Sequence, residues 1–234
     1  MTEELFRDDA YLQRCTAVVI AADDGVVELD RTVFYPTAGG QPGDTGRLVL
    51  DGLHLTVTDT RKGARPGQIL HSADDEALPV GCELLAEIDW PRRHRLMRMH
   101  TCLHLLCRAV DGTVTGGAVG PDKGRLDFDL PEARLDKDEL AARINAWIDE
   151  DHAVCAHWID EDELDRRPDL VRTMSVSPPR GSGRIRLIDI DGLDLQACGG
   201  THVRSTREIG PVRIGKIENK GRQNRRVTVH FAED

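Results

Sequence analysis

Three histidines and one cysteine stand at spacings that could place four metal ligands around one ion. His100 and His104 occur as His-Thr-Cys-Leu-His in a segment with helical periodicity, and residues four apart share one face of a helix. Cys198 and His202 occur far downstream as Cys-Gly-Gly-Thr-His, where the glycines allow a tight turn. Imidazole and thiolate donors suit tetrahedral Zn²⁺, so the two motifs together predict one zinc ion as the cofactor.

The same residues exclude two familiar kinds of hydrolase. His100 is followed by Thr101, so the helix lacks the glutamate that HExxH metalloproteases use as a general base. The chain also lacks a GxSxG nucleophile elbow. Four protein ligands are typical of a closed structural zinc site, whereas a catalytic site normally keeps one position for water. The spacing leaves both alternatives open.

The first part of the chain, residues 1–88, is predicted to form a small β-barrel-like domain. Short β-branched runs alternate there with turn signals such as Asp-Asp-Gly and Asp-Gly. The segment FYPTAGGQPGDTG, Phe34 to Gly46, is so rich in glycine and proline that it cannot be a regular helix or a central strand.

The second part, residues 89–234, is predicted to form a two-layer α+β domain with helices on an antiparallel sheet. Asp89-Trp90-Pro91 is a helix start, and the apolar periodicity carries the helix to about Val110. A second periodic segment runs from Asp136 to Asp149. Strands are expected around Arg125–Leu130, Ile185–Ile190, Val212–Glu218 and Arg225–Phe231.

The composition bounds the class of protein. Of the 234 residues 39% are hydrophobic, which excludes wholesale disorder. No apolar run reaches the roughly 18 residues of a membrane span, and the N-terminal sequence lacks the apolar core of a signal peptide. The six cysteines are interpreted as reduced thiols, so a cytoplasmic protein without a membrane partner is expected.

Charge is distributed unevenly along the chain. The net charge is −10, which argues against a general nucleic-acid binder. Arg180 to Arg226 nevertheless carries 11 Lys/Arg against 5 Asp/Glu, whereas Asp129 to Leu170 carries 5 against 14. We therefore expect one basic face that could contact phosphate and one acidic face that points away from it.

Taken together, the motifs resemble the editing domain shared by alanyl-tRNA synthetases and the free-standing alanyl-tRNA editing proteins of the AlaX type. HTCLHLL and LDLQACGGTHVRSTREIGPVRI carry the likeness to that domain. FYPTAGGQPGDTG resembles the glycine-rich motif of the preceding β domain, and GKIENKGRQNRRV resembles the basic C-terminal strand and turn. The likeness covers nearly the whole chain in order. The chain is too short to include an aminoacylation domain as well, so it resembles the medium-length kind of free-standing editing protein.

The resemblance implies zinc-dependent hydrolysis of misacylated Ser-tRNA(Ala), a trans-editing step in translational fidelity, with Gly-tRNA(Ala) as an open second substrate. A synthetase pocket built for alanine rejects an added hydroxyl poorly, so a second, hydrolytic sieve is useful. By the same resemblance the zinc ligands are His100, His104, Cys198 and His202. The expected catalytic group is a zinc-bound water, and no protein nucleophile is expected, because the aminoacyl ester is already reactive.

The resemblance also implies contacts to substrate and tRNA. Substrate binding is predicted for Thr37, Gly39, Gly40, Gln41, Thr115 and Gly116. Thr37 could bond the serine hydroxyl, although the glycines could equally serve only to shape a turn. Synthetase editing domains often carry a glutamine on the strand after the HxxxH helix, and here Thr115-Gly116-Gly117 stands instead, so the residue that reads serine stays open.

The expected partner is the acceptor end of tRNA(Ala), bound by a monomer. The predicted contacts, which would bind phosphate without reading sequence, are Arg92, Arg93, Arg95, Lys216, Lys220, Arg222, Arg225 and Arg226. Two other functions stay open at this point. One is a tRNA-binding module with a purely structural zinc, and the other is a metalloesterase acting on small molecules.

Overall fold

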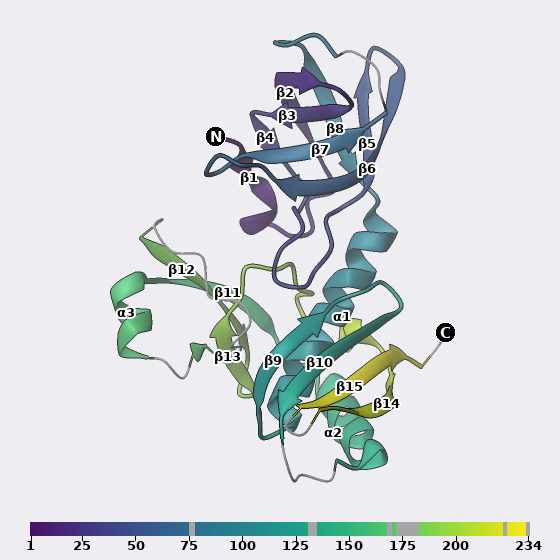
Figure 1. Cartoon of the computed structure of the whole chain (residues 1–234), viewed down its shortest axis with the longest axis vertical. Coiled ribbons are helices and arrows are strands. Elements are labelled where there is room, and N and C mark those ends of the chain that lie inside the picture. The colour runs from purple at the N-terminus through teal and green to yellow at the C-terminus, as the bar shows by residue number, and fades with distance from the viewer. Residues whose placement is uncertain (75–77, 131–134, 168–169, 172–182, 222–223, 233–234) are drawn as a thin grey trace. The chain divides into compact units, whose positions relative to one another are not determined.

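The structure is a computed structural model that describes residues 1–74, 78–130, 135–167, 170–171, 183–221 and 224–232. The chain divides into two compact units, Met1–His94 and Arg95–Asp234. Helix α1 (Trp90–Ala109) begins in the first unit and continues into the second (Figure 1). Across the described residues, none of the helices combines the length and apolarity that a bilayer crossing requires.

A closed barrel forms the centre of the first unit, as the alternation of short strands and turns predicts. Around the barrel the strands follow the order β2, β3, β7, β6, β5, β8. Their bounds are β2 (Arg14–Asp23), β3 (Val26–Leu29), β5 (Gly46–Leu50), β6 (Leu53–Lys62), β7 (Ile69–Ala73) and β8 (Glu83–Ile88). Asp51 and Gly52 both have positive φ, 49° and 84°, and therefore form the tight turn that joins β5 to β6.

The barrel interior is filled by branched aliphatic side chains and Phe34, all of them almost fully buried. Outside the barrel, β1 (Glu3–Glu4) pairs in parallel with β4 (Arg31–Thr32), and the short helix η1 (Leu5–Arg7) buries Phe6. Phe6 meets Tyr35 edge to face, with ring centroids 5.4 Å apart. This small second core lies against the start of the glycine-rich segment.

The second unit contains two antiparallel sheets among its described residues, so the predicted α+β class is confirmed and one further sheet is added. The four-stranded sheet has the order β14, β15, β10, β9, and the three-stranded sheet has the order β11, β12, β13. The bounds are β9 (Thr113–Ala118), β10 (Lys123–Asp129), β11 (Val154–Asp160), β12 (Arg184–Ile190), β13 (Asp194–Ala197), β14 (Val212–Lys220) and β15 (Asn224–Phe231).

Helix α1 is buried on all sides from Leu96 to Val110, apart from the side chains of Arg98 and Arg108. On one side it packs on β10, where a Cβ at Gly124 would lie 2.8 Å from the Met99 side chain. On another side it meets the hairpin of β12 and β13, since Arg108 donates to the carbonyl of Leu193 (2.9 Å). The sequence predicts one apolar stripe, whereas the helix between the two sheets is buried nearly all round, polar side chains such as Thr101 and His104 included.

The remaining helices are α2 (Lys137–Asp149), α3 (Glu161–Arg166) and the short η3 (Thr206–Ile209). The side chain of Asp136 caps α2 by accepting from two backbone amides of its first turn. Leu140, Ile144 and Ile148 form the buried face of α2. The Asn145 side chain bonds both backbone groups of Val212 (2.8 and 2.9 Å) and so ties α2 to β14.

Candidate metal centre

The second unit brings together the four side chains that the two sequence motifs single out. His100 and His104 are one turn apart on α1, and Cys198 and His202 lie in the loop that follows β13. Their donor atoms all lie within 4.8 Å of one another. The Sγ of Cys198 is 3.6 Å from the Nε2 of His100 and 3.3 Å from the Nε2 of His202.

The loop that carries Cys198 and His202 is held by a buried arginine. Arg186 of β12 donates through Nη1 to the carbonyls of Cys198 (3.1 Å) and Gly200 (2.8 Å). The backbone amide of Cys198 in turn bonds the carbonyl of Arg186 (3.1 Å). The guanidinium therefore fixes the path of the glycine turn and the position of the sulfur.

Thr101 determines which nitrogen of His202 faces the cluster. Its hydroxyl donates its single proton to the carbonyl of Met97 (3.0 Å), so it accepts at its other contacts. Those contacts are the backbone amide of Val203 (3.3 Å) and Nδ1 of His202 (3.1 Å). His202 consequently carries its proton on Nδ1 and directs the lone pair of Nε2 toward Cys198.

Asp194 does the same for His104. Its carboxylate, on β13, accepts from Nδ1 of His104 (3.2 Å) and from the side-chain amide of Gln196 (2.6 Å). Asp194 and Gln196 are two residues apart on the strand and therefore share a face. An acid that orients a ligating histidine through its outer nitrogen is a common feature of zinc sites.

The electrostatics of the cluster favour the metal-binding forms of Cys198 and His202, a thiolate and a neutral imidazole, whereas they favour the protonated form of His104. Burial raises the pKa of the Cys198 thiol, but the charges of His100 and His202 outweigh burial and bring that pKa well below its ordinary range. Burial and the charge of His100 lower the pKa of His202 well below its ordinary value. Burial also lowers the pKa of His104, yet hydrogen bonds to Asp194 and Cys198 outweigh it and raise the pKa to about 9.

The donor set and its geometry fit a tetrahedral ion. Zn–N and Zn–S bonds of about 2.0 to 2.3 Å place neighbouring donors of a tetrahedron roughly 3.3 to 3.8 Å apart. The distances from the Cys198 sulfur to its two histidine nitrogens, 3.3 and 3.6 Å, lie in that range. Three imidazoles and one thiolate are also the donor types that zinc accepts.

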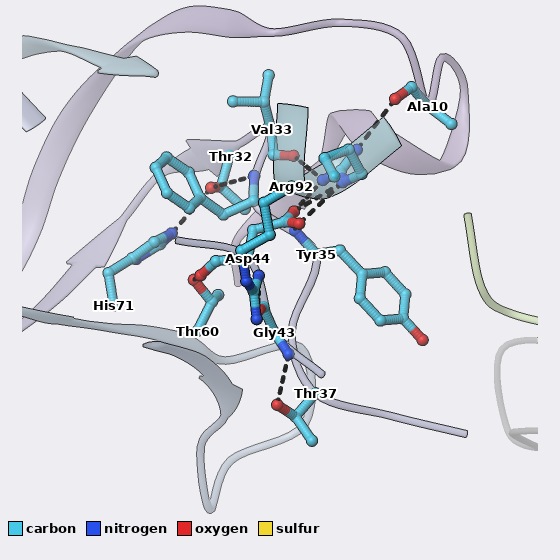
Figure 2. Close-up of polar contacts among 12 residues, drawn as sticks. Ala10, Thr32, Val33, Tyr35, Thr37, Gly43, Asp44, Thr60, His71 and Arg92 are labelled. Atoms are coloured by element: carbon cyan, nitrogen blue, oxygen red, sulfur yellow. Dashed lines mark hydrogen bonds and ion pairs between the residues drawn. The ribbon is translucent and has the colours of Figure 1, made fainter. Parts of the chain in front are cut away.

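The glycine-rich segment belongs to the first unit, where Asp44 organises it (Figure 2). Asp44 accepts from the backbone amide of Tyr35 and pairs with the guanidinium of Arg93, while its carbonyl accepts from the Thr60 hydroxyl (2.9 Å). The Thr37 hydroxyl accepts from the amide of Gly43 (2.7 Å). The segment is thus a rigid loop whose shape is set by side chains on several elements.

Gly39 and Gly40 are required by the turn that they form. Their φ angles are +57° and +81°, and the flanking Ala38 and Gln41 exchange two backbone hydrogen bonds (3.1 and 2.9 Å). Two consecutive residues with positive φ characterise the tight two-residue hairpin turn. Gln41 is fully buried, whereas Thr37 is exposed.

The two predicted substrate residues of β9, Thr115 and Gly116, make contacts within the four-stranded sheet. The Thr115 hydroxyl contacts the carbonyl of Asp127 (3.1 Å) and Oδ1 of Asn224 (3.0 Å). Gly116 pairs with Asp127 next to an irregularity in the register of β9 and β10. These contacts give both residues a place in the sheet without any ligand.

The prediction that Arg93 binds tRNA is wrong. Its side chain is 0% exposed and forms an ion pair with Asp44, which is 1% exposed. Its remaining donors bond the carbonyls of Val33 (2.8 Å) and Ala10 (3.0 Å). A guanidinium enclosed in this way cannot reach a phosphate.

The other predicted tRNA contacts have varied surroundings. Arg92 donates to the carbonyl of Gly43, and Arg95 contacts Pro121 and Asp122. Arg226 makes two hydrogen bonds to Asp127 (2.7 and 2.8 Å). Lys220 lies 3.7 Å from Glu218, Arg225 bonds the carbonyl of Asn224, and Lys216 is exposed. Arg222 lies outside the described residues.

Sequence reasoning missed the residues that orient the cluster: Thr101, Arg186, Asp194 and Gln196. A usable signal existed for two of them, because polar residues at alternate positions immediately precede the Cys-Gly-Gly-Thr-His motif. Thr101 gave no such signal, since its partner is 101 residues away.

Comparison with known proteins places the chain among tRNA-editing proteins. Residues 185–228 match the family described as threonyl and alanyl tRNA synthetase second additional domain, and residues 6–92 match tRNA synthetases class II (A). An alanyl-tRNA editing protein AlaX-M from Methanosarcina acetivorans is 38% identical over 97% of this chain and 98% of that protein. The chain belongs to the AlaX-M family of alanyl-tRNA editing proteins.

Other relatives agree with this membership. The AlaX-M protein from Saccharolobus solfataricus is 36% identical over 97% of this chain and 98% of its own length. An alanine–tRNA ligase from Pyrobaculum neutrophilum is 35% identical over 93% of this chain, which corresponds to 25% of the ligase. The resemblance to an AlaX-type protein is thereby confirmed, and the ligase matches only through one part of a longer chain.

Proposed function

We propose that this chain hydrolyses misacylated Ser-tRNA(Ala), with Gly-tRNA(Ala) as a second candidate substrate, and acts in trans for translational fidelity in the cytoplasm. Membership of the AlaX-M family makes the chain a deacylase of aminoacyl-tRNA. The observation that carries the proposal is the convergence of His100, His104, Cys198 and His202, whose donor atoms lie within 4.8 Å of one another.

These four side chains would hold one Zn²⁺ ion. When bound, the ion supplies a Lewis acid that can polarise the ester carbonyl or activate water. Thr101 and Asp194 bond Nδ1 of His202 and His104, which would leave Nε2 of each ring available to the ion. No serine or cysteine nucleophile is needed, because the ester is reactive and Cys198 serves as a donor.

The substrate contacts in this proposal are the ones that the family resemblance implies. In the first unit the exposed Thr37 would meet the serine hydroxyl, and Gly39 and Gly40 would let the backbone lie close to substrate. In the second unit Thr115 and Gly116 remain candidates on β9. Phosphate contacts are assigned to the predicted basic residues other than Arg93: Arg92, Arg95, Lys216, Lys220, Arg222, Arg225 and Arg226.

Release of serine from Ser-tRNA(Ala) by the zinc-loaded protein tests the proposal. We expect a rate well above the uncatalysed background, and a much lower rate with correctly charged Ala-tRNA(Ala) as the matched control. Background rates with both Ser-tRNA(Ala) and Gly-tRNA(Ala) contradict it.

One observation favours a second candidate, a tRNA-binding module with a structural zinc. All four donors come from the protein, and the three histidines are only 5–7% exposed, as in closed structural sites. The substitution His100→Ala separates the two functions. A variant that folds and binds tRNA but releases no serine supports catalysis, whereas a variant that unfolds supports the structural role.

A further inference from the structure

The side chains of Arg213, His230 and Lys123 form a row across one face of the four-stranded sheet. Arg213 of β14 pairs directly with His230 of β15, and His230 pairs with Lys123 of β10. Side chains at paired positions point to the same face, and neighbouring strands are about 4.8 Å apart. Arg213 and Lys123 are exposed, while the adjacent positions Ile214 and Val229 are buried. The row therefore lies on the face opposite the core.

Within the described residues, neither Arg213 nor Lys123 has an ion-pair or hydrogen-bond partner for its side chain. Elsewhere on this face the cations are neutralised, since Arg125 and Arg226 both pair with Asp127. The acid next to Lys123 in sequence, Asp122, contacts Arg95 instead (3.2 Å).

Protein stability gives no reason for the row. Arg213 and Lys123 lie two strands apart, about 10 Å, and neither gains stability from an opposite charge among the described residues. The net charge of the chain is −10, so two nearby cations with no counter-charge among the described residues are not what its overall charge predicts. A polyanion bound against the row would supply the counter-charge that Arg213 and Lys123 lack among the described residues.

The central histidine is packed rather than loosely exposed. A Cβ at Gly215 would lie 2.9 Å from Cδ2 and Nε2 of His230, so glycine at this position leaves room for the ring. Burial, followed by the charges of Arg213 and Lys123, lowers the pKa of His230. Near neutral pH the ring is therefore uncharged and can donate one N–H between two full positive charges.

We propose that Arg213, His230 and Lys123 bind the phosphate backbone of the tRNA acceptor arm. The inference rests on the proposed function, which supplies the RNA. Arginine and lysine that have no counter-charge among the described residues can bind backbone phosphates without reading sequence, and a neutral imidazole N–H adds a hydrogen bond. Lys216, exposed on the same strand as Arg213, extends this basic surface toward the tRNA contacts already assigned.

The double substitution Arg213→Gln with Lys123→Gln removes two charges and keeps long polar side chains. The matched control, Lys137→Gln with Arg166→Gln, removes two charges from exposed positions of α2 and α3. Binding of uncharged tRNA(Ala) is measured over a series of KCl concentrations, together with hydrolysis of Ser-tRNA(Ala) and of seryl-adenosine. Thermal unfolding verifies that each variant is folded, and the single variant Lys123→Gln replaces the double variant if that one is not.

We expect the double variant to bind tRNA about tenfold more weakly or worse at low salt. The slope of log affinity against log salt should fall by about 2, roughly one for each lost phosphate contact. The KM for Ser-tRNA(Ala) should rise, while hydrolysis of seryl-adenosine, which lacks the backbone, should not change. The control variant should keep the affinity and slope of the unaltered protein.

Unchanged affinity and salt slope in the double variant overturn the inference, as does an unaltered protein that binds no tRNA. The binding measurement needs no turnover, so it separates this inference from the proposed function. If the protein binds tRNA through Arg213, His230 and Lys123 but releases no amino acid, the proposed deacylase substrate is wrong. The same result supports the proposed role of these three residues.

Discussion

Both units bury histidines, but the rings face different surroundings. In the first unit His71 bonds the carbonyl of Val27 through Nδ1 (3.0 Å) and the hydroxyl of Thr32 through Nε2 (2.8 Å). In the second unit His104 and His202 also bond protein groups through Nδ1, but their Nε2 atoms point toward a shared cluster with Cys198.

The comparison shows that burial alone does not indicate the role of a histidine. A ring with both nitrogens satisfied by the protein is a structural element, and burial lowers the pKa of His71 to about 4, which keeps it neutral. Rings fixed through one nitrogen that present lone pairs to a common point form a ligand set. The distinction depends on what the second nitrogen faces.

The strongest way to break the comparison is to remove one ligand. His104→Ala should abolish stoichiometric zinc binding and reduce serine release to background, a loss on the order of 1,000-fold or more. Zinc content by mass spectrometry and serine release from Ser-tRNA(Ala) measure both effects. Cys155→Ser, at an exposed cysteine, is the control. Full zinc content and full activity in the His104 variant would rule out the ligand set.

Arg93→Met tests the first unit, because it leaves Asp44 buried without its counter-charge. The loss of stability should be about 3–5 kcal/mol, whereas zinc content should not change. Arg47→Met, which breaks the exposed pair with Glu87, should cost less than about 1 kcal/mol. Urea unfolding measures both variants. Similar losses in the two variants would show that the buried pair has no special role.

Acid should destabilise the first unit through His71. Its pKa is about 4 when folded and near 6.5 when unfolded, so the unfolded chain binds the extra proton first as the pH falls. The stabilisation is present above pH 6.5 and is lost progressively toward pH 4, by about 3 kcal/mol at most. Urea unfolding at pH 7 and pH 4.5 measures the loss.

His71→Gln should remove this part of the pH dependence, whereas His54→Gln, at an exposed position of the same barrel, should keep it. An identical pH dependence in the protein with and without His71 would show that the ring is not the titrating group.

The smallest effect is expected when the acid that orients His104 is replaced, which tests how the ligand rings of the second unit are held. Asp194→Asn keeps the size of the side chain but weakens the orientation of His104, so zinc affinity should fall by about 10- to 100-fold. Asp191→Asn, at an exposed position of the same hairpin, should leave it unchanged. Competition with a chromogenic chelator measures the affinity. Equal affinities in the two variants would mean that Asp194 does not orient the ligand.

Local patterns in the sequence predicted much of the fold. The turn signals predicted the barrel, and Asp89-Trp90-Pro91 predicted the start of α1, which begins at Trp90. Residue types and spacing also selected the four side chains that meet in the second unit. Each of these features depends on residues close together in the chain or on strongly restricted motifs.

The features that could not be predicted depend on distant partners. Arg93 stands among other arginines in the sequence. Only the fold shows that it is buried and paired with Asp44, 49 residues away. Asp194 lies 90 residues from His104 along the chain and meets it only because β13 packs beside α1. The row of Arg213, His230 and Lys123 likewise exists only through strand register.

X-ray absorption at the zinc edge of the purified protein tests the central claim most directly. The account predicts one zinc per chain, bound by three nitrogen donors and one sulfur donor, with the sulfur signal lost in Cys198→Ser. A protein that takes up no zinc from one added equivalent, or whose zinc has no sulfur neighbour, would contradict it.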